Sequence, residues 1–126
     1  MILFINTATD DKEISLIKNK KIIKKIIFQK RFGEAENLLL MIDKLLKEGK
    51  TKIKDLKRII AVKGPGNFTS LRIGILIANT LAYTLKIPVY GIKLDELDGL
   101  LSLKFKSRKI EFVLPFYGKD PSITLK

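Results

Sequence analysis

The sequence predicts an α/β fold built on one mixed β-sheet. Two observations lead to this: the first third of the chain shows strand-like apolar runs only, and further strands then alternate with segments of helical apolar spacing. A length of 126 residues fits one domain with one hydrophobic core. With 46% hydrophobic and 30% charged residues, the composition is that of a globular chain rather than a disordered one.

The first third predicts a three-stranded antiparallel meander. Residues 2–5 form a β-branched and aromatic run that stops at the turn formers of residues 6–11. Residues 14–17 and 22–28 then flank a polar turn, in which Asn19 can adopt the positive φ that a tight hairpin requires.

A first helix is predicted for residues 34–47, where apolar residues recur at helical spacing and acidic residues occupy the first turn. Residues 38–42 are all apolar and encircle the helix axis, so one sheet cannot cover them and a second cover is expected. Residues 58–62 follow as a buried strand, whose continuous apolar run is typical of parallel pairing.

A second helix is predicted from about residue 68 to residue 85, and it is apolar nearly all round. Gly74, Ala78 and Ala82 recur at four-residue spacing and predict a smooth stripe on which another helix can pack. The remaining expected elements are a strand at residues 88–92, a helix at 95–103 and a strand at 110–114.

This order of elements is the ribonuclease-H-like layout, in which a meander pairs antiparallel and later crossovers add parallel strands. No linker or repeat indicates a second domain. We therefore assign residues 1–114 to a single lobe and residues 115–126 to a C-terminal tail.

The composition excludes several kinds of chemistry. The chain has no Cys and no His, which removes disulfides, thiolate nucleophiles, imidazole bases and the usual zinc, haem and iron–sulfur sites. Asp10 and Asp11 are adjacent acids after a strand and are better explained as solvated or capping residues than as a metal pair. No nucleophile has a recognisable base beside it. We expect no catalytic residue, no metal and no cofactor.

The net charge of +12 favours a polyanion as partner, although an excess of Lys also follows from codon bias. No apolar run reaches the roughly 18 residues of a membrane span, and the first residues lack the features of a signal peptide. We therefore expect a cytoplasmic protein without a membrane partner.

A glycine-rich turn precedes the second helix and is a candidate anion-binding site. Backbone amides and the positive end of the helix dipole would face a phosphate there, at Gly64, Gly66, Asn67 and Thr69. The turn is not a P-loop, because the Lys of that motif is missing. A purely structural turn is the alternative.

Two polar residues interrupt the second helix. Arg72 can pair with a carboxylate, reach solvent or cross an interface. Asn79 needs hydrogen-bond partners for its amide, so it either caps a loop or pairs across a helix interface.

Three segments carry a resemblance to a known family. Residues 2–9, 64–74 and 88–92 resemble the TsaB (YeaZ) family of tRNA threonylcarbamoyladenosine biosynthesis proteins. The central segment is the specific one: the family writes it approximately Gly-Pro-Gly-Ser-Phe-Thr-Gly-x-Arg-Ile-Gly, and this chain differs at Asn67 and Ser70.

The resemblance implies one lobe of the actin/hexokinase/Hsp70-like superfamily and a noncatalytic scaffold role in tRNA modification. The implied partners are a TsaD-like threonylcarbamoyltransferase, a TsaE-like ATPase and, through the complex, tRNA; alone, the chain is expected to form a homodimer. The two main helices would form the interface, for which we predict Leu38, Met41, Leu45, Leu71, Arg72, Ile75, Ala78 and Asn79.

The chain also departs from the family. Asn6 stands where relatives that use ATP have an acid, and no His opens the first helix. The second lobe is expected to be missing, although residues 115–121 resemble a stretch near the end of full-length relatives. Two alternative functions stay open: a small nucleotide-binding phosphotransferase and a stand-alone basic RNA-binding module.

Overall fold

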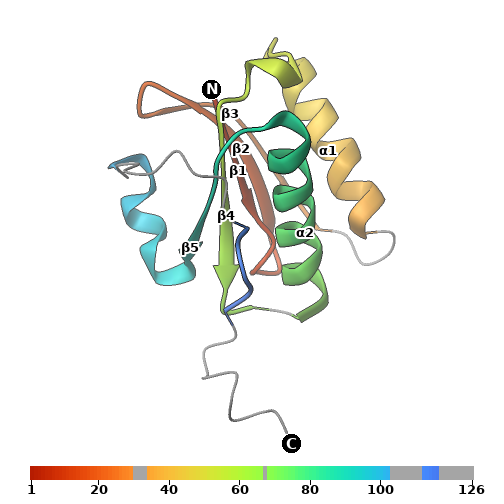
Figure 1. Ribbon diagram of the computed structural model, residues 1–126, viewed down its shortest axis with the longest axis vertical. Coiled ribbons are helices and arrows are strands. Elements are labelled where there is room, and N and C mark those ends of the chain that lie inside the picture. The colour runs from red at the N-terminus through yellow and green to blue at the C-terminus, as the bar shows by residue number, and fades with distance from the viewer. Residues whose placement is uncertain (30–33, 67, 103–111, 117–126) are drawn as a thin grey trace, which may run out of the picture.

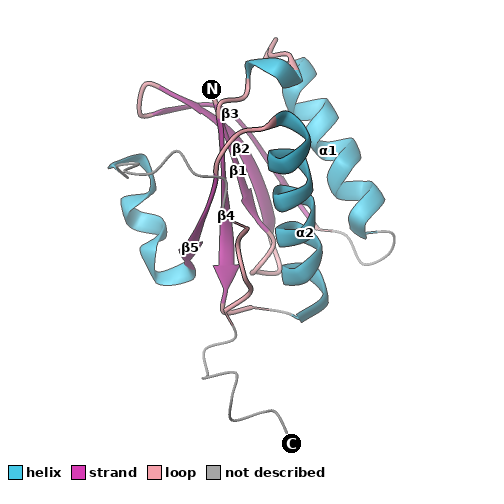
Figure 2. Ribbon diagram, in the orientation of Figure 1, coloured by secondary structure: helices cyan, strands magenta, loops and turns pink. Residues whose placement is uncertain are grey.

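The computed structural model describes residues 1–29, 34–66, 68–102 and 112–116, which form one mixed sheet with helices on both faces (Figure 1, Figure 2). The strand order is β3-β2-β1-β4-β5. The elements are β1 (Ile2–Asn6), β2 (Lys12–Lys18), β3 (Lys21–Phe28), α1 (Glu34–Glu48), η1 (Ile53–Asp55), β4 (Arg58–Gly64), α2 (Phe68–Leu85), β5 (Val89–Lys93) and η2 (Leu94–Ser102).

The pairing confirms the predicted ribonuclease-H-like fold. β1 pairs antiparallel with β2, and β2 with β3, which is the meander. β1 then pairs parallel with β4, and β4 with β5, as helical crossovers require. Ile2 at the start of β1 lies opposite Ile17 on one side and Arg58 on the other, and this register aligns one end of the sheet.

Strand alternation divides the core into two layers. Figure 1 shows α1 and α2 on one side of the sheet and η2 on the other. On the side of α1, Leu16 lies directly against Gly49, which follows the last turn of that helix. On the side of η2, Ile60 is buried and lines a pocket together with Leu100. The element bounds show that the meander, both main helices and β4 form where the sequence predicts them.

Two expected elements need correction. A strand was expected at residues 110–114, but residues 112–114 belong to no strand. Residues 110 and 111 lie outside the described residues. The helix expected at 95–103 is the 3-10 helix η2, and Leu103 lies outside the description. The cause of the first error is Asn79, whose side chain takes the backbone bonds that a neighbouring strand would make.

The small residues of α2 pack within the chain, whereas the sequence predicted that another helix would pack on them. A Cβ at Gly74 would lie 2.1 Å from the hydroxyl oxygen of Thr7, in the loop after β1, and Ala78 and Ala82 are fully buried. The small side chains therefore let α2 approach its own domain rather than another chain. Neither α1 nor α2, as described, is long and apolar enough to cross a membrane.

Candidate functional site

The interface residues predicted from the sequence lie mostly on the wrong side of their helices. Leu38 and Leu45 on α1 and Leu71, Ile75 and Ala78 on α2 are between 0% and 4% exposed. Their side chains form the core, so they cannot contact a partner. Met41 is half-buried and packs against this core, Arg72 is exposed, and Asn79 is half-buried.

Other apolar side chains of the two helices are exposed. Leu39 and Leu40 on α1 are 48% and 63% exposed, and Leu76 and Tyr83 on α2 are 64% and 70% exposed. Leu76 and Tyr83 are two turns apart and so lie on one side of α2. We call these four residues the helix face. Five apolar residues in a row on α1 did predict a second apolar side, but not its orientation.

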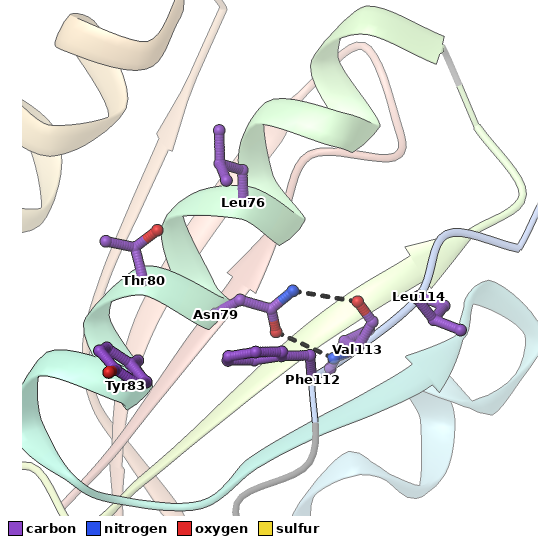
Figure 3. Close-up of a pocket in the computed structure, with 7 residues that line it drawn as sticks. All are labelled: Leu76, Asn79, Thr80, Tyr83, Phe112, Val113 and Leu114. Carbon is purple, nitrogen blue, oxygen red and sulfur yellow. Dashed lines mark hydrogen bonds between the residues drawn. The ribbon is translucent and has the colours of Figure 1, made fainter.

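A groove of about 460 Å³ adjoins the helix face, between α2 and the described C-terminal segment (Figure 3). Phe112 and Leu114 project from that segment and are 59% and 76% exposed. The ring of Phe112 lies 6.3 Å from that of Tyr83, centroid to centroid, within the usual range of an aromatic pair. The groove is lined by Leu76, Asn79, Thr80, Tyr83, Phe112, Val113 and Leu114. The contribution of residues 112–114 was not predicted.

Asn79 holds this segment in place. Its Nδ2 donates to the Val113 carbonyl at 3.0 Å, and its Oδ1 accepts from the Val113 amide at 2.9 Å (Figure 3). The buried Val113 side chain lies against Gly91 of β5, where a Cβ would approach it to 2.7 Å. Of the two predicted roles for Asn79, capping a loop is confirmed.

The glycine-rich turn is packed against its own chain. A Cβ at Gly64, whose φ is +125°, would lie 1.9 Å from the Phe116 carbonyl oxygen, and one at Gly66 would lie 2.3 Å from that of Ala8. The Phe116 amide also donates to the Lys63 carbonyl at 2.6 Å. These glycines thus serve close packing, which favours the structural alternative over an anion site. Thr69 is exposed on the first turn of α2, and Asn67 lies outside the described residues.

Asn6 is engaged within its own loop. Its Oδ1 accepts from the Ala8 amide at 2.9 Å, and its Nδ2 donates to the Thr9 hydroxyl at 3.3 Å. The side chain is only 7% exposed, so it stabilises the turn after β1 rather than facing a ligand. Asp11 bonds Gln29 through its carboxylate. Within the described ranges no cluster of three or more His, Cys, Asp or Glu residues could hold a metal ion.

Comparison with known proteins identifies the family. The family model described as "TsaD: tRNA N6-adenosine threonylcarbamoyltransferase" matches residues 33–109, more than half of the chain. The chain is 37% identical to the tRNA threonylcarbamoyladenosine biosynthesis protein TsaB of Buchnera aphidicola subsp. Schizaphis graminum, over 87% of this chain and 52% of that protein. The chain belongs to the TsaD family. Its similarity to TsaB proteins makes it a TsaB-like member of that family.

Two further similarities agree with this assignment. The TsaB protein of Bacillus subtilis is 30% identical over 86% of this chain and 51% of its own length. The solved structure of YeaZ from Pseudomonas aeruginosa superposes with a TM-score of 0.67 at 27% identity, covering 73% of this chain and 43% of that one. The TsaB-like chain therefore spans about half the length of the curated relatives it matches.

Proposed function

We propose that the chain is a noncatalytic scaffold subunit in tRNA threonylcarbamoyladenosine modification, which pairs with a TsaD-like transferase and stabilises it. The observation that carries this proposal is the helix face. Leu40, Leu76 and Tyr83 each expose more than 60% of their surface, although apolar side chains of this size gain stability when buried. The TsaB relatives are named for threonylcarbamoyladenosine biosynthesis, which supports the pathway.

The noncatalytic role is supported by the two loops at the carboxyl ends of β1 and β4. An ATP-using relative would need an acid at position 6 and open amides in the glycine turn. Here Asn6 is bonded within its loop, and Gly64 and Gly66 lie against Phe116 and Ala8. The same contacts count against the alternative function, a small nucleotide-binding phosphotransferase.

The proposal extends to the other partners. Without a transferase, the helix face would be covered by a second copy of the chain, since a symmetric pair buries the same residues twice. The TsaE-like ATPase and tRNA would join through the complex with the transferase. The site of action would be the cytoplasm.

The test is co-expression with the TsaD-like protein of the same genome, followed by size-exclusion chromatography with light scattering. We expect a 1:1 complex, and we expect Leu76→Arg to abolish it because a guanidinium would be forced into an apolar interface. Leu101→Arg is a matched control, because Leu101 is 39% exposed and lies on η2, on the other side of the sheet from α2. A complex that survives Leu76→Arg, or no complex with the native chain, would contradict the proposal.

A further inference from the structure

The end of the sheet at which β1 and β4 begin carries a row of cations. The register places Lys18 of β2 opposite Lys21 of β3, and the Lys57 amide donates to the Met1 carbonyl at 2.8 Å beside Arg58. The row spans the four adjacent strands from β3 to β4, with cations on or beside β3, β2 and β4. We call Lys18, Lys20, Lys21, Lys57 and Arg58 the basic edge.

The positive charge at this edge is concentrated enough to act on a neighbouring group. The pKa of the Met1 amino group is lowered, first by partial burial and then by Lys18, Lys57 and Arg58, while Asp55 opposes the shift. Asp55 is itself engaged, since its carboxylate accepts from the Lys52 amide at 3.0 Å. The basic edge is thus a region where several cations act together on one group.

The opposite end of the sheet carries charges of both signs. Asp10 and Asp11 follow β1 there, and Asp95 and Glu96 follow β5; all four are exposed. Lys63 and Lys93 lie at the same end. Because these four acids lie beside the lysines, positive charge is more concentrated at the basic edge than at this end. This difference makes the basic edge the preferred end of the sheet for a polyanion.

A pocket of about 230 Å³ opens at the basic edge, on the side of the sheet covered by η2. Its apolar wall is aliphatic, and an amide and two cations complete it. The lining residues are Ile2, Ile17, Asn19, Lys20, Arg58, Ile60, Leu100 and Leu101. An apolar wall beside an amide and cations matches a nucleotide, which has a flat base with polar edges and a phosphate.

We propose that the basic edge binds the phosphate backbone of a single-stranded RNA segment and that the adjoining pocket takes one unstacked base. A row across four strands fits successive phosphates of a chain better than one small anion. Asn19 supplies both a donor and an acceptor for the edge of the base. That the RNA is a tRNA rests on the proposed function, but the binding itself is a property of the chain alone.

The charge half of the proposal is tested with the full chain and a fluorescently labelled, unmodified tRNA transcript, by anisotropy at several salt concentrations. We expect Lys18→Gln with Lys57→Gln to weaken binding at least about tenfold near 50 mM salt and to lower the salt slope by about 1.4. The control, Lys63→Gln with Lys93→Gln, removes the same charge near the opposite end of the sheet. An unchanged slope, or an equal loss in the control, would overturn the proposal.

The pocket half is tested with a single-stranded oligouridylate and an RNA duplex of equal charge. We expect the native chain to prefer the single strand and Asn19→Gly to lose that preference; Gly retains the positive φ of 53° that Asn19 adopts. Equal binding of both probes by the native chain would overturn the pocket assignment. Both tests omit the transferase, so their failure is distinct from failure of the heterodimer.

Discussion

Asn79 and Val113 are 34 residues apart and form a two-way hydrogen bond in which one side chain satisfies both backbone polar groups of the other residue. The bond ties α2 to a segment that belongs to no strand and completes the groove beside the helix face. A polar residue in an apolar helix is thereby explained without any partner chain.

We expect Asn79→Ala to lower the free energy of unfolding by about 1–2 kcal/mol, because two hydrogen bonds are lost and the Val113 backbone loses its partner. Urea denaturation followed by circular dichroism measures the change, and hydrogen exchange should show a faster Val113 amide. Thr80→Ala is the control, since Thr80 is exposed one position along the helix and Ala favours helix. Equal stability of Asn79→Ala and the native chain would contradict this role.

The order of elements was predictable because period-2 and period-3.6 apolar patterns report on local structure directly. The meander, α1, β4 and α2 accordingly form at the expected residues. The side on which a helix meets the sheet was not predictable for α2, because a helix that is apolar nearly all round has no polar side to point outward. The buried positions of Leu71 and Ile75 follow from packing that only the tertiary structure shows.

The orientation of α2 predicts opposite outcomes for two similar substitutions. Ala78→Arg should destabilise the fold by more than about 3 kcal/mol, because Ala78 is 0% exposed and a guanidinium has no space or partner there. Leu76→Arg should leave stability within about 1 kcal/mol, because Leu76 is 64% exposed. Thermal denaturation of the two variants separates them. A stable Ala78→Arg variant would mean that α2 is rotated relative to the structure.

The groove beside α2 could not be predicted from the sequence, because two distant segments form it. The groove joins α2 to residues 112–114, and the contact depends on Gly91 admitting the Val113 side chain as well as on Asn79. Nothing local to either segment indicates their contact. By contrast, the sequence alone located the glycine turn. Its role in close packing depends on contacts with Phe116 and Ala8, which only the structure shows.

The glycine turn predicts that Gly64 does not tolerate a side chain. Gly64→Ala should lower the free energy of unfolding by at least about 2 kcal/mol, because a φ of +125° is strained for Ala and its Cβ would overlap the Phe116 carbonyl. Gly99→Ala is the matched control: a Cβ at Gly99 meets nothing within 4 Å, so we expect a change within about 0.5 kcal/mol. Chemical denaturation of both variants measures the difference. Similar stabilities would show that the turn is not closely packed.

Placing an acid at position 6 should not create nucleotide binding. In Asn6→Asp the carboxylate can still accept from the Ala8 amide, so we expect the fold to persist. The bond to Thr9 is lost, because the Thr9 hydroxyl already donates its one proton to the Asp11 carbonyl at 2.8 Å. The turn at Gly64 and Gly66 stays filled by the chain itself, so isothermal titration with magnesium and ATP should show no saturable heat. Asn6→Leu, which removes both hydrogen bonds, should instead destabilise the loop by about 1–3 kcal/mol. Saturable ATP binding by Asn6→Asp would mean that one charge is what separates this chain from its ATP-using relatives, and the noncatalytic assignment would have to be abandoned.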